Sequence, residues 1–192
     1  MNLKKAIFPI FILMVSVQLY VPSSMIWHNE DILETGKEFK FKTAPIDPND
    51  PFRGKYIILD YDNNVVKVSK EHDWKRGEDI YVSFTENKDG FVVAKTISRE
   101  KPSTDTHFVK AEVGFINYTN NDLSIDYPFD RFYMEESKAH DAEITYWESQ
   151  RDTTKTAYAL VHIKNGDAVL KDVLIDGVPI RELVDTEKEN NQ

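Results

Sequence analysis

The sequence predicts a mainly β protein, in which an N-terminal transmembrane or signal helix precedes an antiparallel β barrel or sandwich with one short helix. Three observations predict this class. The chain begins with one long apolar stretch. Short runs of alternating apolar and polar residues then recur about every 8–12 residues, with turn residues between them. Residues 137–150 depart from that pattern, because they combine Ala, Glu, Tyr and Trp without Gly or Pro, which favours a helix.

The N-terminal segment has the composition of a membrane-targeting sequence. Lys4 and Lys5 precede the uncharged, mostly apolar stretch Ala6–Trp27. A spanning helix needs about 20 residues, so the stretch is long enough for an uncleaved anchor. A basic start and a short apolar core also suit a signal peptide, here cleaved near Ser24. Both alternatives place the rest of the chain outside the cytoplasm, on the periplasmic or extracellular side.

Charge and cysteine content exclude several classes of function. The chain has 192 residues and a net charge of -9, and all 33 acidic residues follow the apolar stretch. The part after the stretch holds 22 basic residues and therefore has a net charge of -11. Such an acidic domain lacks the basic footprint that nucleic acid or anionic lipid requires. The absence of cysteine excludes disulfides and thiolate sites.

The remaining elements follow in order. We expect a targeting segment at 1–27, one β-rich domain at 28–187 that begins with a short connector from His28 to Lys37, and a disordered tail at 188–192. Asn87–Gly90 and Asn165-Gly166 predict hairpin turns. Val109, Ala111, Val113 and Phe115 are expected to share one face of a strand. The single expected helix of the domain is Ser137–Gln150, and the expected strands are Tyr56–Tyr61, Val65–Val68, Ile80–Phe84, Phe91–Ile97, Phe108–Tyr118, Leu123–Tyr127, Tyr158–Ile163 and Ala168–Ile175.

The stretch Asp47–Tyr61 carries the most specific motif. Two Asp-Pro steps and an Arg-Gly pair lead into a strand with Ile57, Leu59 and Tyr61 on one face. This stretch resembles the motif of the bacterial GDYXXLXY domain family, Gly-Asp-Tyr-x-x-Leu-x-Tyr. The matching residues are Gly54, Tyr56, Leu59 and Tyr61, whereas Lys55 stands where the family has Asp.

The resemblance extends beyond the motif. Residues 75–82, 126–136 and 168–177 also look like family segments, although Pro128 and Asp130 replace the Gly and Glu of its Tyr-Gly-Ile-Glu-Arg pattern. The resemblance implies an uncleaved membrane anchor and an extracytoplasmic domain. It also implies a polytopic membrane protein as partner, because family members are often encoded beside such proteins. It implies no particular reaction.

One polar cluster is the candidate site for a ligand or partner. If the fold joins two segments, it brings together carboxylates, guanidinium groups and phenols. Such a cluster could bind a cation through carboxylates, bind an anion through arginines, or place a protonated carboxylic acid beside an ionised one. The alternative, which the turn-forming Asp-Pro steps favour, is an architectural cluster in which Arg53 holds a loop. Its members are Asp47, Asp50, Arg53 and Tyr56 from the first segment and Asp130, Arg131, Tyr133 and Glu143 from the second.

These patterns predict a binding or scaffold domain and not an enzyme. The sequence has no His-Glu-x-x-His pair, no Gly-x-Ser-x-Gly elbow and no phosphate-binding glycine loop. We therefore assign no catalytic residue, no metal ligand and no cofactor. The alternatives are an exported hydrolase and a sensor of a small ligand or cation, both of which would use the polar cluster.

Overall fold

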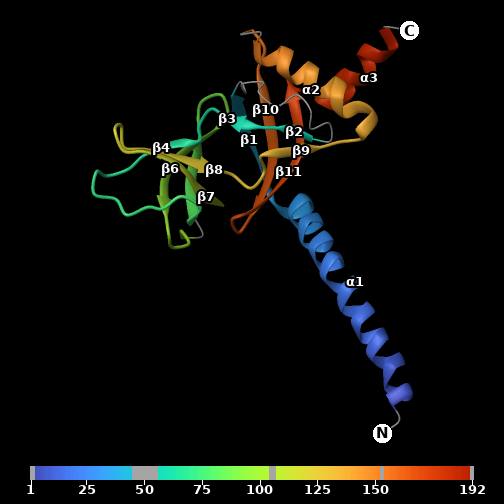
Figure 1. The fold of residues 1–192 in the computed structure, drawn as a ribbon. Helices are drawn as coiled ribbons and strands as arrows, with labels where there is room; N and C mark the ends of the chain where they lie inside the picture. The colour runs from blue at the N-terminus through green and yellow to red at the C-terminus, as the bar shows by residue number, and fades with distance from the viewer. Residues whose placement is uncertain (1–2, 45–55, 104–106, 152–153, 191–192) are drawn as a thin grey trace.

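The computed structural model describes residues 3–44, 56–103, 107–151 and 154–190. It is mainly β and antiparallel, as the sequence predicts, with a long N-terminal helix (Figure 1). The elements are α1 (Leu3–Thr35), β1 (Lys37–Ala44), β2 (Tyr56–Ile58), β3 (Asp60–Tyr61), β4 (Val65–Lys67), β5 (Asp79–Glu86), β6 (Val92–Ser98), β7 (Phe108–Asn117), β8 (Asp122–Asp126), β9 (Arg131–Tyr133), α2 (Glu136–Arg151), β10 (Ala157–Lys164), β11 (Asp167–Ile175), β12 (Val178–Pro179) and α3 (Ile180–Asn190).

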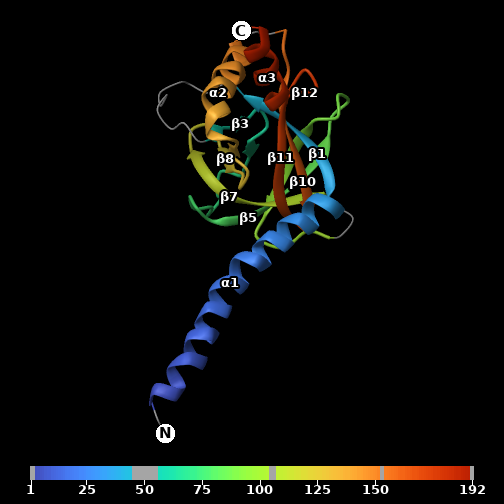
Figure 2. The ribbon, with the colours of Figure 1, turned by 90° about the vertical axis from the view of Figure 1, so that its right-hand side faces the viewer.

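The helix α1 projects away from the β domain, and α2 and α3 lie at the opposite end of that domain (Figures 1 and 2). The segment Phe8–Thr35 is long and apolar enough to cross a membrane. Its apolar 18-residue window has a mean hydropathy of 1.7, and the domain buries none of that window. The expectation of a short connector from His28 to Lys37 is wrong, because the helix continues to Thr35. The Gly36 N–H then donates to the Ile32 carbonyl at 2.8 Å and ends the helix.

Two five-stranded sheets and one strand pair form a nearly closed, barrel-like structure. The strand orders are β12-β11-β10-β1-β3 and β4-β8-β7-β5-β6, and β2 pairs with β9. The two larger sheets meet where the Lys110 N–H donates to the Gly166 carbonyl at 2.8 Å. They meet again at a bridge between Lys40 and Phe91.

The turn at Asn165-Gly166 joins β10 to β11 as predicted. Both residues have positive φ, 55° and 94°, which suits the two-residue turn of a right-twisted hairpin. Glycine has a second role here, because a Cβ at Gly166 would lie 2.6 Å from a ring carbon of Phe108. The turn therefore packs directly on the first residue of β7.

The core is rich in aromatic side chains around Phe41. Its ring lies 4.9 Å from that of Phe129 and 5.8 Å from that of Tyr61, centroid to centroid, in edge-on geometry. The motif strand contributes as predicted, since Ile57, Leu59 and Tyr61 are all buried. Burial of these alternate residues confirms the two-face interpretation of the motif.

Two expectations about the domain are wrong. Phe115 is 66% exposed, because a bulge between Val113 and Ile116 shifts the alternation of β7 by one residue. The domain also has a second helix, α3, whose Ile180 and Val184 are buried against the rest of the fold. This helix extends to Asn190, into the segment expected as a disordered tail.

Candidate functional site

The structure covers part of the predicted polar cluster. Asp47, Asp50, Arg53 and the motif residue Gly54 lie outside the described residues. Tyr56, Asp130, Arg131, Tyr133 and Glu143 are described, and the first four lie together on or beside the β2–β9 pair.

Three of these side chains share the outer face of the β2–β9 pair. Tyr56 lies directly opposite Tyr133, and the two rings are 5.4 Å apart. The Arg131 guanidinium lies 5.3 Å from the centre of the Tyr56 ring, within cation–π range. A hydrogen bond with the Tyr133 side chain, followed by the charge of Asp130, raises the pKa of Arg131. The face is therefore a cationic aromatic patch.

The two acidic members of the predicted cluster that the structure describes, Asp130 and Glu143, do not belong to the cationic aromatic patch. Asp130 lies 3.8 Å from the Arg131 Nε, and its backbone carbonyl accepts a hydrogen bond from the Leu59 N–H at 2.8 Å. Glu143 is half-buried on α2, which packs beside β2. Among the described residues, no hydrogen bond or ion pair joins Glu143 to the patch.

The described structure also contains a cleft of about 510 Å³ that the sequence did not indicate. It opens between the C-terminal end of α1, the β10–β11 turn, the start of β5, the middle of β7, the end of β8 and the loop before β9. Asp130 belongs to both this cleft and the predicted cluster. The cleft is lined by His28, Asn29, Ile32, Asp79, Lys110, Ala111, Glu112, Asp126, Tyr127, Pro128, Asp130, Gly166, Asp167 and Ala168.

A row of carboxylates crosses the wall of the cleft. Glu112 on β7 lies directly opposite Asp79 on β5 and directly opposite Asp126 on β8. Like charges in directly opposed positions of neighbouring strands destabilise a sheet. The row, defined here as Asp79, Glu112 and Asp126, therefore gives the wall a negative charge at a cost in stability.

The basic side chains of the cleft, Lys110 and His28, are directed to one aspartate. Lys110 Nζ lies 2.6 Å from Asp167 Oδ1, and this hydrogen bond raises the pKa of Lys110. His28 Nε2 lies 3.3 Å from the other oxygen of Asp167. No basic side chain of the described residues pairs with the carboxylate row, which therefore keeps its negative charge. Within the described ranges, no group of His, Asp and Glu side chains has the arrangement of a metal site.

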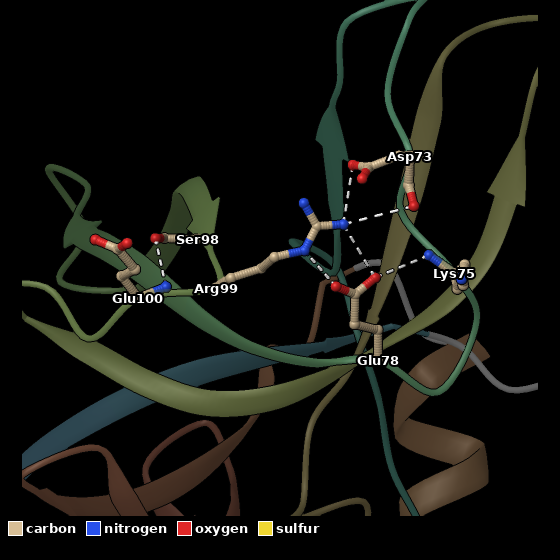
Figure 3. Close-up of polar contacts among 6 residues, drawn as sticks. All are labelled: Asp73, Lys75, Glu78, Ser98, Arg99 and Glu100. Atoms are coloured by element: carbon tan, nitrogen blue, oxygen red, sulfur yellow. Dashed lines mark hydrogen bonds and ion pairs between the residues drawn. The ribbon is translucent and has the colours of Figure 1, made fainter.

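A polar network joins the loop before β5 to the segment that follows β6, directly before Asp79 in the chain (Figure 3). Glu78 accepts a hydrogen bond from the Lys75 backbone N–H at 3.0 Å and pairs with Arg99 on the neighbouring segment. Arg99 also lies 2.9 Å from Asp73 and packs over the Trp74 ring. The guanidinium lowers the pKa of both partner carboxyls, Asp73 and Glu78. This network is architectural, and it holds the strand that begins with Asp79.

Comparison with protein families identifies the family to which the chain belongs. The family model described as "GDYXXLXY protein" matches residues 18–173. The chain belongs to the GDYXXLXY family. The match includes the cleft, the cationic aromatic patch and the C-terminal half of α1. Neither the curated proteins nor the solved structures contain a significant match to this GDYXXLXY protein.

Proposed function

We propose that this GDYXXLXY protein is a membrane-anchored, extracytoplasmic binding or scaffold domain that acts together with a membrane protein. The observation that carries the proposal is the packed junction between the apolar helix and the β domain. A domain that only needs to stay near a membrane can be attached to its anchor through a flexible linker. Here only Gly36 separates the helix from β1.

Three contacts make the junction rigid. Ile32 on the last turns of α1 is 1% exposed and packs into the domain. Asp31 Oδ2 lies 2.6 Å from Lys164 Nζ at the end of β10. His28 adds its contact with Asp167 on the other side of the β10–β11 turn. A domain attached in this way has a fixed orientation relative to the bilayer.

The fixed orientation directs the acidic cleft toward the membrane surface. Trp27, at the outer end of the apolar stretch, directly precedes His28 and Asn29, which line the cleft. A tryptophan at this position suits the membrane interface. The cleft therefore lies just above the headgroups, where the extramembrane ends of a partner's helices would meet it.

A linker insertion tests whether orientation matters. Ten Gly and Ser residues inserted between Trp27 and His28 keep the tether but release the domain from the helix. Cross-linking in native membranes is expected to give a discrete partner adduct for the parent chain and much less for the insertion variant. The same insertion between Lys88 and Asp89, in the exposed β5–β6 turn, is the control and should retain the adduct.

Two results would contradict the proposal. A mature chain that begins near Ser24 and is released from membranes would exclude the anchor. A monomer that hydrolyses a substrate, with turnover lost in Asp50→Asn, would instead support the exported hydrolase.

A further inference from the structure

Gln18 lies within the apolar part of α1, and its side chain has no hydrogen-bond partner among the described residues. It is exposed on the helix surface. It lies nine positions before Trp27, which corresponds to about 13.5 Å along a helix. In a hydrocarbon layer about 30 Å thick, this places the amide near the middle of the membrane.

Pro22 leaves a second polar group of Gln18, its backbone carbonyl, without a helical hydrogen bond at the same depth in the membrane. Proline has no N–H, so the backbone carbonyl four residues earlier, that of Gln18, lacks its helical donor. Two serines of the helix differ, because Ser16 and Ser24 donate to the carbonyls of Ile12 and Val21 at 2.8 and 2.7 Å. Unpaired amide and carbonyl groups are costly in hydrocarbon, where no water replaces the missing partner.

Helical spacing gives the direction in which Gln18 points. Residues 7, 11 and 14 positions later share its face of the helix, and these are Met25, Asn29 and Ile32. Asn29 and Ile32 line the acidic cleft. One continuous face of α1, here called the Gln18 face, therefore runs from the middle of the membrane to the cleft.

We propose that a transmembrane helix of a different membrane protein packs along the Gln18 face and hydrogen-bonds Gln18 there. The inference rests on the proposed membrane anchor. The partner helix carries Ser, Thr, Asn or Gln at the same depth, because such side chains both donate and accept hydrogen bonds between membrane helices. Its outer end lies below the cleft, where basic residues complement the carboxylate row.

Charge favours a different protein over a second copy of this chain. A second copy on the Gln18 face would bring an identical acidic row and another domain of net charge -11 against the cleft. Like charges in juxtaposed surfaces suppress association. The partner is therefore a helix that lacks this acidic domain.

Photo-cross-linking of the full chain in native membranes tests the inference. A photoreactive residue replaces either Met25, on the Gln18 face, or Trp27, on the opposite face. We expect an adduct with one other protein from position 25 and at least severalfold less from position 27. Peptide mapping should place the cross-link in an apolar helix of the partner. Gln18→Leu should reduce the adduct severalfold, whereas Ser16→Leu, on the opposite face, should not.

Other outcomes would overturn the inference. Equal adducts from positions 25 and 27, an adduct of two copies of this chain, or an undiminished adduct in Gln18→Leu would each contradict it. Carbonate extraction distinguishes a failure of the helix-partner inference from a failure of the proposed membrane anchor. A chain that stays in the membrane without a position 25 adduct contradicts the helix partner alone, whereas a chain released by carbonate contradicts the anchor.

Discussion

At the scale of single residues, the buried leucine of the family motif is decisive for stability. Leu59 is 3% exposed, whereas its neighbour Ile58 is 41% exposed on the cationic aromatic patch. Leu59→Ala should lower the free energy of unfolding by about 2–5 kcal/mol, because it leaves a cavity in the core. Ile58→Ala is the matched control, with an expected loss within about 0.5 kcal/mol. Thermal unfolding of the detergent-solubilised chain measures both, and equal losses would contradict the two-face interpretation.

Tyr61 predicts a loss of stability at alkaline pH. Its hydroxyl donates to the Phe129 carbonyl at 2.7 Å, and burial raises its pKa well above the usual value. Above about pH 10 the unfolded chain loses a proton that the folded chain keeps, so the free energy of unfolding falls as pH rises. Tyr61→Phe should cost about 1–3 kcal/mol near neutral pH, because the carbonyl loses its buried donor.

Urea titrations from pH 7 to pH 11 measure this dependence. The decline should be shallower in Tyr61→Phe, although Tyr127, whose pKa burial also raises, keeps part of it. Parallel slopes in the parent and the variant would mean that Tyr61 loses its proton equally in both states.

At the scale of elements, two hairpin glycines form a matched pair. Gly166 and Gly177 both have positive φ, 94° and 85°, but only Gly166 faces the Phe108 ring. Gly177→Ala should cost about 1 kcal/mol through backbone strain. Gly166→Ala should cost distinctly more, since the added methyl also displaces the ring. Differential scanning calorimetry compares the two, and equal losses would show that the turn does not depend on its contact with β7.

The elements differ in how far the sequence could predict them. Local signals sufficed for the β10–β11 hairpin, because Asn165-Gly166 specifies its own turn. The bulge that exposes Phe115 was missed, since it depends on pairing with β8. The second helix was missed because residues 180–190 hold few apolar side chains. The cleft could not be predicted from the sequence. Its carboxylate row of Asp79, Glu112 and Asp126 forms only because the register of three strands places these residues side by side.

At the scale of the whole molecule, the carboxylate row predicts a conflict between stability and binding. Glu112→Gln, at the centre of the row, should raise the thermal midpoint at low salt by removing both cross-strand repulsions. The gain should shrink in about 1 M salt, where charges are screened over about 3 Å. Asp89→Asn, in the exposed β5–β6 turn, is the control and should change little. If Glu112→Gln is more stable but no longer binds the membrane partner, the carboxylate row lowers stability because binding requires its charge.

The place of β1 in its sheet also governs the order of assembly. This strand leaves the ribosome early, directly after α1, yet its main neighbour is β10, which begins at Ala157. Until that part of the chain is made, β1 has an open edge with alternating apolar residues, a configuration that invites aggregation. Pairings between such distant segments also form slowly. Nascent chains that stop before residue 157 should therefore depend on chaperones or be degraded, even though they already contain the whole family motif.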